Sequence, residues 1–319
     1  MKPIGWVSHP DDVEKLVAEW RSDERVVVDE LRQYTGRPVF AITLGAGGGK
    51  PAVLFNKPHA HEPAPCAAMM NAIAKLLTGR GLDGEPPPIN PQAVLDQLTL
   101  TFIPDANPGG TERAPVTWWD GTQYTNEEFW VWMRGLNPET GKMWERYDKW
   151  DMRTVELKPA TIGIVYEQIS EHEYVEPNRH HDSSLFKLVF RLRERYDYRL
   201  LAALHQTEFV GTMFDSMAIL PIDFDDQAEP VRDAELSAGR KMVEWWERWG
   251  GRPIQEIKPL GYGGQQAEYF RRAWSEPFKD TPRITSEVRN NSLLCPPSMQ
   301  RRLSEAAIWA CIEAVIEQL

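Results

Sequence analysis

The chain has 319 residues, of which 42% are hydrophobic and 26% charged, as in an ordinary globular protein. The formal net charge of −11 argues against nucleic acid or an anionic membrane as a partner, because either would favour a basic face. No apolar run approaches the ~18 residues of a membrane span and the first residues contain no apolar signal core, so we expect a cytoplasmic protein.

The first part of the chain combines a helical segment with two strand-like ones. Residues 13–20 place apolar side chains at helical spacing, and we expect residues 26–31 to continue as helix. Residues 39–44 and 52–55 are apolar runs typical of buried strands. The glycine-rich residues 45–50 lack the spacing of a phosphate-binding loop, and a proline follows their lysine. We therefore expect a hairpin turn there.

Helices and strands continue to alternate through the rest of the chain. Residues 65–77 predict a helix, and residues 98–103 predict a strand that runs into a loop rich in proline and glycine. We also expect strands at residues 161–166 and 199–204, although the second could be the end of a helix. The remaining expected elements are a short strand within residues 282–291 and helices at residues 235–249 and 304–319.

Strands separated by helices indicate an α/β fold in which loops at one edge of the sheet carry the functional residues. No segment resembles a linker between two cores, so we expect one domain over residues 1–319. The tryptophan-rich stretch at about residues 113–150 is expected to be an insertion or a long ordered loop. Its indole rings either pack in a core or line a substrate pocket.

Histidines and a glutamate suggest a metal site. His59 and Glu62 stand three residues apart just past a predicted strand end, where both can reach one ion. Hydrolytic zinc sites commonly use two histidines and one glutamate. We expect His205 to be the third ligand, because an apolar run precedes it and places it at the end of an element. For His61 we expect a supporting or pocket-lining role.

Two other groups of potential ligands receive lower priority. His180 and His181 are the second choice for the third ligand, because the residues around them are those of a solvated loop. The three cysteines are odd in number and show no Cys-x-x-Cys pattern, which argues against a disulfide framework or a thiolate zinc site.

A hydrolytic zinc site also needs a general base that takes a proton from the attacking water. The candidate is Glu287, which lies in the short alternating strand late in the chain. The alternative interpretation of Glu287 is an exposed strand residue without a catalytic role.

Taken in order, these motifs resemble the zinc carboxypeptidase family (carboxypeptidase A-like). The matching elements are His59-x-x-Glu62 after a strand, an Asn-Pro loop at residues 107–110, a distant His205, and Glu287 near the C-terminus. The resemblance spans roughly residues 35 to 317. It implies one domain with a mixed, about eight-stranded sheet, one Zn²⁺ ion bound by the two histidines and Glu62, and Glu287 as general base.

The resemblance also implies residues that bind the substrate, a peptide or an amide-containing small molecule cleaved at its C-terminal amide bond. An arginine of the family stabilises the oxyanion, and Arg113 is the nearest match after the Asn-Pro loop. The family's Asn-Arg pair, which binds the terminal carboxylate, is not evident, and Arg134 is a possible substitute. The family's mobile tyrosine corresponds to Tyr262 or Tyr269, and we favour Tyr262 because glycines flank it.

Three other functions stay open at this point. A zinc amidohydrolase of the desuccinylase or aspartoacylase type would remove the acyl group from an amino acid instead of cleaving a peptide. A catalytically inactive module would use zinc only for its structure. A nucleotide-binding protein would use residues 45–50, which the proline at position 51 argues against. The oligomeric state does not follow from the sequence.

Overall fold

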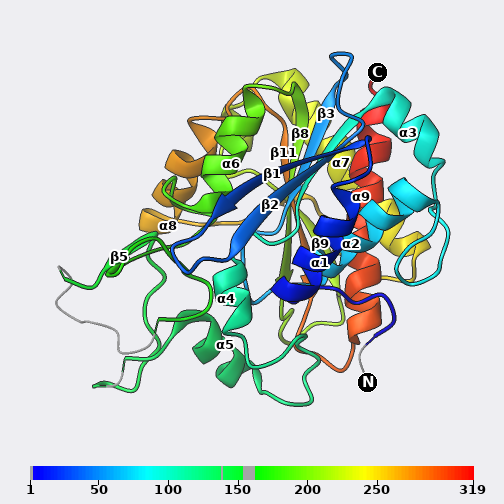
Figure 1. Ribbon diagram of the computed structural model, residues 1–319. Helices are drawn as coiled ribbons and strands as arrows, with labels where there is room; N and C mark the ends of the chain where they lie inside the picture. Colours follow the sequence, from blue (N-terminus) through cyan, green and yellow to red (C-terminus); the bar gives the residue numbers. More distant parts are fainter. Residues whose placement is uncertain (1–2, 138, 154–161) are drawn as a thin grey trace.

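The apolar runs along the chain form the strands of one mixed sheet. The computed structural model describes residues 3–137, 139–153 and 162–319, and within them the central sheet has eight strands (Figure 1). In sheet order these are β1 (Val26–Arg32), β2 (Pro38–Leu44), β4 (Thr99–Ile103), β3 (Ala52–Asn56), β8 (Tyr198–Thr207), β11 (Arg283–Arg289), β9 (Ser216–Leu220) and β10 (Lys258–Pro259). Strands β4, β3, β8 and β11 are parallel to one another, whereas β2 and β9 run antiparallel to their neighbours β4 and β11.

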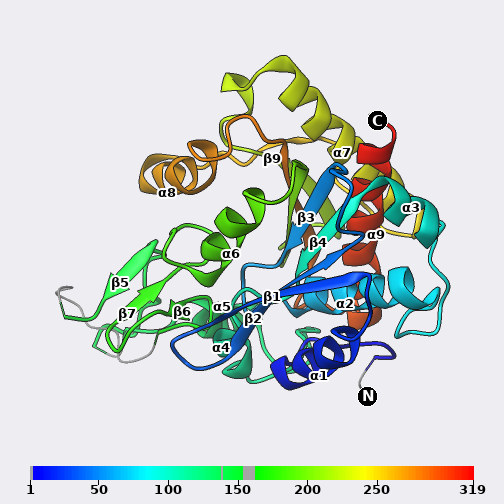
Figure 2. The ribbon, with the colours of Figure 1, turned by 45° about the horizontal axis from the view of Figure 1, so that its top comes forward.

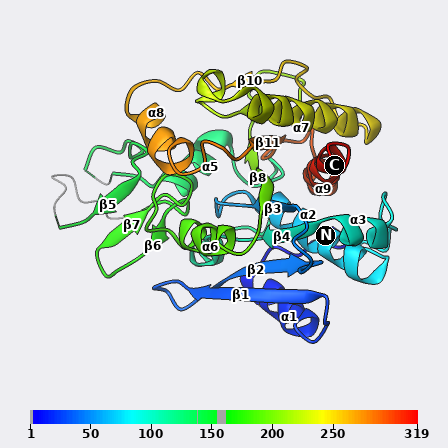
Figure 3. The ribbon, with the colours of Figure 1, turned by 90° about the horizontal axis from the view of Figure 1, so that it is seen from above.

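Helices cover both faces of this sheet, as Figure 3 shows from above. One face packs against α1 (Pro10–Trp20), α2 (Pro63–Thr78), α3 (Pro91–Gln97), α7 (Glu229–Arg248) and α9 (Pro297–Ile316). The other face packs against α6 (Ser184–Arg193) and the π-helical turn Arg271–Ser275, which follows α8 (Gly264–Phe270). In the described ranges no helix is both long and apolar enough to cross a membrane.

The two faces of β8 have different roles. Successive side chains of a strand point to opposite faces, so Leu200, Ala202 and Leu204 enter the large core beneath α2 and α9. Leu201 belongs to the smaller core beneath α6, and His205 follows it on that same face. The α6 face of the sheet therefore carries the polar residues at the strand end.

A smaller region built largely from loops lies beside the C-terminal ends of the parallel strands (Figure 2). It contains α4 (Pro108–Glu112), α5 (Asn126–Arg134) and a three-stranded sheet of β5 (Lys149–Asp151), β7 (Glu173–Val175) and β6 (Glu167–Gln168). Trp119 packs edge-on against Phe129 of α5, and Trp144 packs edge-on against Trp150. These three buried tryptophans therefore form the local cores of this region.

The α/β class and the eight-stranded mixed sheet are confirmed, but three local predictions are wrong. Residues 26–31 form the edge strand β1, because three consecutive valines favour extended backbone and pair with β2. Residues 45–50 form no hairpin, because β4 lies between β2 and β3 in the sheet. Residues 162–166 form a turn rather than a strand, and Thr161 lies outside the described residues.

Glu167 is a buried carboxylate that joins the small sheet to the start of α6. It accepts hydrogen bonds from the backbone N–H and the hydroxyl of Ser184. Burial raises the pKa of Glu167 to about 7, more than the hydrogen bonds from Ser184 lower it. The folded protein therefore holds this proton at pH values where an unfolded chain has released it.

We expect Glu167→Gln to change how stability depends on pH. Because the pKa of Glu167 is higher in the folded state, its contribution to the free energy of unfolding falls as pH rises from about 4.5 to 7. A neutral glutamine can accept the Ser184 backbone N–H with its oxygen and donate from its amide nitrogen to the Ser184 hydroxyl oxygen. It also removes this loss, so the variant should be more stable than wild type at pH 8 by roughly 2–3 kcal/mol. Urea unfolding at pH 5 and pH 8 measures this, and an equal difference at both pH values would contradict it.

Candidate functional site

The turn after β3 positions His59 and Glu62. Lys57, the first residue after the strand, donates its backbone N–H to Ile103 of β4, and its buried ammonium pairs with Asp105 at 2.8 Å. These contacts join the ends of two parallel strands. The chain then turns so that Glu62 is the residue before α2, which begins with Pro63. The side chains of His59 and Glu62 thus lie just beyond the sheet edge, on a firmly anchored turn.

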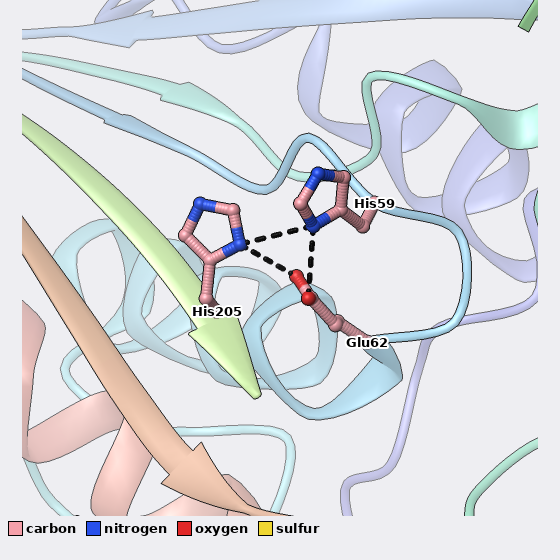
Figure 4. A group of neighbouring side chains, drawn as sticks. All are labelled: His59, Glu62 and His205. Atoms are coloured by element: carbon pink, nitrogen blue, oxygen red, sulfur yellow. Dashed lines mark hydrogen bonds and ion pairs between the residues drawn. The ribbon is translucent and has the colours of Figure 1, made fainter. Parts of the chain in front are cut away.

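His205 on β8 completes a group of three metal-donor atoms. The Nδ1 atom of His59 lies 2.9 Å from Glu62 Oε1 and 3.1 Å from His205 Nδ1, and His205 Nδ1 lies 2.9 Å from Glu62 Oε2. Figure 4 shows both ring nitrogens and the carboxylate directed at one common point. All three residues are buried, and they are the single such group of metal donors within the described ranges.

The geometry and protonation of this group fit a divalent metal ion. Ligand atoms about 2.0–2.1 Å from a tetrahedral zinc ion lie roughly 3.3 Å apart, close to the spacings seen here. Two imidazole nitrogens that face each other at 3.1 Å need a shared proton or a cation between them. Burial alone would raise the pKa of Glu62, yet the imidazoles of His59 and His205 hold that pKa well below its usual value. The ionised carboxylate and the two rings form a donor set suited to Zn²⁺.

Glu176 orients the ring of His59. The Nε2 atom of His59 lies 2.7 Å from Glu176 Oε1, so Nε2 donates to this carboxylate and leaves the lone pair of Nδ1 for a metal ion. Glu176 is fully buried and follows β7 directly. Burial would raise its pKa, but His59 and the guanidinium groups of Arg179 and Arg146 keep the pKa far below the usual value. This carboxylate behind a histidine ligand is an arrangement common in metal sites.

Glu287 lies beside His205 because β8 and β11 are paired in parallel. The register aligns the Cα atoms of Glu287 and His205. Glu287 is half-buried, and its Oε2 atom is buried with no hydrogen-bond partner among the described residues. Burial raises the pKa of Glu287 to about 8; nearby His205 opposes the rise, and the carboxylates of Glu62 and Glu208 add to it. A poorly paired carboxylate next to a metal-donor group is available for proton transfer.

The donor group and Glu287 open into one cavity of about 250 Å³. Tyr262 lines this cavity from the loop before α8, with its ring stacked on Phe270 at 5.1 Å. Its side chain is partly exposed and comes from a loop bordered by glycines. The structure therefore brings Tyr262 together with His59, Glu62, His205 and Glu287.

Arg113 and Arg134, which the sequence predicts as site residues, do not line this cavity. The Arg113 guanidinium donates to the backbone carbonyls of Ile162, Gly163 and Tyr166 and so supports a loop of the small region. The Nε atom of Arg134 donates to the carbonyl of Trp144 at 2.9 Å. Both arginines stabilise loop backbone, and neither lines the cavity.

Three further polar residues line the cavity, and the sequence did not single them out. Arg146, Asn178 and Arg179 line the cavity. The Nη2 atom of Arg146 lies 3.1 Å from His59 Nε2, and Arg179 Nε lies 2.7 Å from Glu176 Oε2. Asn178 and Arg179 are adjacent in the chain, on the segment between β7 and α6. The pair was visible in the sequence, but it stands in a polar segment that resembles an ordinary solvated loop.

Of the other predicted histidines, His61 lines the cavity, whereas His180 and His181 do not. His61 lines the cavity, stacks on His59 with ring centroids 5.2 Å apart, and lies 3.3 Å from Glu62 Oε1. It thus has the pocket-lining position expected for it. His181 donates from Nε2 to the carbonyl of Ala273 at 3.0 Å, and neither it nor His180 belongs to the donor group.

Comparison with solved structures identifies the fold. A metallo-carboxypeptidase from Burkholderia cenocepacia aligns with a TM-score of 0.60 and 13% identity, over 97% of this chain and 70% of that one. One from Pseudomonas aeruginosa, in complex with (2-guanidinoethylmercapto)succinic acid, gives 0.59 and 13%, over 97% and 68%. The fold is that of the metallo-carboxypeptidases. Bovine thrombin-activatable fibrinolysis inhibitor, in complex with tick carboxypeptidase inhibitor, gives 0.56 and 12%, over 98% of both chains.

Sequence comparison alone detects no such relationship. No protein-family model matches the chain, and a search of curated proteins gives no match either. The likeness to solved structures therefore establishes the fold alone.

Replacing His205 by alanine should remove tight metal binding. The change takes away one of three donor atoms and leaves the other two 2.9 Å apart. We expect about one metal ion per wild-type chain and at least a tenfold lower affinity in the variant, measured by elemental analysis after dialysis against a weak chelator. His181→Ala is the matched control and should bind metal like wild type. Full occupancy in the His205 variant would place the ion elsewhere.

Proposed function

We propose that this protein is a zinc-dependent hydrolase that cleaves the C-terminal amide bond of a peptide or a peptide-like small molecule. One observation supports this most strongly. The donor group of His59, Glu62 and His205 shares a single cavity with the carboxylate of Glu287, and Arg146 and Arg179 also line that cavity. A metal site alone would serve structure, but a metal site with a base and anion-binding groups suits hydrolysis.

In this proposal, His59, Glu62 and His205 hold one Zn²⁺ ion. When bound, zinc supplies Lewis-acid chemistry: it polarises the amide carbonyl and makes water a better nucleophile at neutral pH. Glu176 keeps His59 in the tautomer that can serve as a ligand. His59 and Glu62 come from one turn after β3, whereas His205 comes from β8, the strand that pairs with β3 in the sheet.

Glu287 acts as the general base and then as the general acid. It accepts a proton from the attacking water and donates it to the departing amine. The pKa of about 8 that burial causes would keep the carboxyl protonated at neutral pH, and a nearby cation lowers the pKa of a carboxyl group. Positive charge at the donor group therefore favours the ionised form of Glu287, which is the form a base requires.

Arg146 and Arg179 bind the two negatively charged groups of the reaction, the oxyanion and the terminal carboxylate of the substrate. Arg146 is the guanidinium nearest to the donor group, so we assign it to the oxyanion that forms at the scissile carbonyl. Arg179 and Asn178, on the segment after β7, bind the terminal carboxylate of the substrate. Tyr262 closes over the bound substrate from its glycine-bordered loop. The apolar flank of the cavity accepts the terminal side chain.

Glu287→Gln should abolish most turnover while leaving metal binding intact. The amide has the shape of the carboxylate but cannot take up a proton, and general-base catalysis is worth about 10²–10⁴-fold in rate. The measurement is kcat for a blocked dipeptide, together with metal content. Glu256→Gln, at an exposed position, is the control and should match wild type. Wild-type turnover in the Glu287 variant would remove this residue from the mechanism.

Arg179→Met should lower kcat/KM for substrates with a free C-terminal carboxylate but not for substrates with an amidated C-terminus. Loss of a guanidinium that binds the terminal carboxylate should lower kcat/KM for peptides with a free C-terminus by roughly 10–100-fold. For the same peptides with an amidated C-terminus, kcat/KM should be low in wild type and nearly unchanged in the variant. Arg134→Met serves as control, because this arginine lies outside the cavity. An equal loss for both substrates would indicate a structural defect instead.

A further inference from the structure

The floor of the cavity is built from matched rows of side chains on neighbouring strands. Parallel pairing aligns His205 with Glu287, Ala203 with Thr285, and Leu201 with Arg283. All six residues line the cavity, as expected for alternate residues on one face of a sheet. The rows therefore run from the reacting groups at the strand ends toward the middle of the sheet.

The side chains in the middle row of the floor, Ala203 and Thr285, are small, and many of the side chains around the cavity are apolar. Ala203 and Thr285 leave space above the sheet, and Asn56 and Ile219 occupy the same row on the outer strands. Apolar side chains that also line the cavity are Leu201, Leu220, Ile222, Leu260, Phe270 and Trp274. A terminal side chain that enters between these side chains would lose contact with water along most of its length.

Arg283 lies at the far end of the floor. Residues on one strand face repeat at about 6.6 Å, so Arg283 lies roughly 13 Å from Glu287 along β11. Its Nη2 atom donates to both oxygens of Asp223 at 2.8 and 2.9 Å, and the pair is buried. Its Nε atom, although buried, has no hydrogen-bond partner among the described residues.

A second unpaired polar group lines the same cavity. The buried hydroxyl of Ser275 also lacks a partner in the described part of the chain. Ser275 ends the turn Arg271–Ser275, which packs with Leu201 in the core beneath α6. Buried donors left unpaired cost free energy, so a ligand that supplies acceptor atoms at this depth regains it.

The charges around Arg283 restrict what can bind. Asp223 already pairs with the guanidinium, and the buried Glu235 accepts the backbone N–H of Arg283. Burial raises the pKa of Glu235 to about 7, so it adds little more than a partial negative charge near neutral pH. A lysine or arginine side chain would bring only donors to a place that offers unpaired donors. A purely apolar side chain would leave Nε and the hydroxyl unpaired.

We propose that this inner end selects substrates whose terminal residue has a side chain ending in a carbonyl or carboxylate oxygen, with glutamine and glutamate as the best fit. This inference rests on the proposed function for the orientation of the substrate. The backbone positions of Glu287 and Arg283 lie roughly 13 Å apart along β11, which leaves room along the floor for the Cα atom and an extended side chain of a terminal residue.

The first test measures binding, which does not depend on turnover. N-acetyl-L-glutamine, N-acetyl-L-glutamate, N-acetyl-L-leucine and N-acetyl-L-lysine share an acetylated α-amino group and a free α-carboxylate, and they differ only in the side chain. Calorimetric titration into the zinc-loaded Glu287→Gln protein should show that the glutamine and glutamate compounds bind roughly tenfold or more tightly than the other two. Their order relative to each other distinguishes a carboxamide from a carboxylate, and both belong to the proposed class.

The second test uses variants of the inner end. Arg283→Met combined with Asp223→Asn avoids leaving a buried unpaired aspartate and should reduce the preference for glutamine and glutamate to about onefold. Ser275→Ala, a smaller change, should reduce it in part. Arg252→Met is the matched control, because Arg252 also pairs with a buried aspartate, Asp215, but outside the cavity.

The outcomes separate this inference from the proposed function. Selective binding of the glutamine and glutamate compounds that depends on Arg283 supports the inference, even if wild-type protein hydrolyses no peptide and the proposed function fails. Equal binding of all four compounds, tighter binding of the leucine or lysine compound, or no binding of any of them would overturn the inference. So would a preference that survives the double replacement.

Discussion

The parallel pairing of β8 with β3 on one side and β11 on the other is the constraint on which the whole site depends. This pairing carries His205 to the end of the same sheet edge from which the turn after β3 begins. It also aligns Glu287 with His205, so that a candidate base and a candidate ligand are neighbours without any loop between them. A shift of β8 by one residue would turn His205 into the core beneath α2 and α9 and destroy the donor group. Strand register thus positions His205 and Glu287, and it places them next to the turn that carries His59 and Glu62.

Electrostatics explain why this arrangement calls for a cation. The carboxylates of Glu62, Glu176, Glu208 and Glu287 lie in or beside one cavity, and Arg146 and Arg179 are the guanidinium groups that face them there. Burying charges is costly unless they are compensated. A divalent ion between the two imidazoles and Glu62 would balance the remaining negative charge. The same ion would favour the ionised state of Glu287, so metal binding and the supply of a base are coupled.

The sequence predicts the site residues that directly follow a strand, because a local pattern marks the strand end. It does not predict the site residues whose place depends on how a loop folds. His59 and Glu62 follow an apolar run at close spacing, so their place at a strand end could be inferred directly. The position of Arg113 after an Asn-Pro loop favours a place in the site, but its guanidinium binds backbone carbonyls and does not line the cavity. Asn178 and Arg179 enter the cavity only because β7 and α6 hold the segment between them. The residues next to Asn178 and Arg179 in the sequence do not indicate that this segment enters the cavity. The valine-rich residues 26–31 form a strand only because they pair with β2, and a local pattern cannot show that pairing.

The central claim is that His59, Glu62 and His205 bind one catalytic metal ion through the atoms that face each other here. A crystal structure of the zinc-loaded protein, with anomalous difference maps measured above and below the zinc absorption edge, tests it directly. We predict a single strong peak within bonding distance of His59 Nδ1, a carboxylate oxygen of Glu62 and His205 Nδ1, with Glu287 on the open side. A peak bound by His180 or His181, or an empty donor group in protein that contains zinc, would contradict the account.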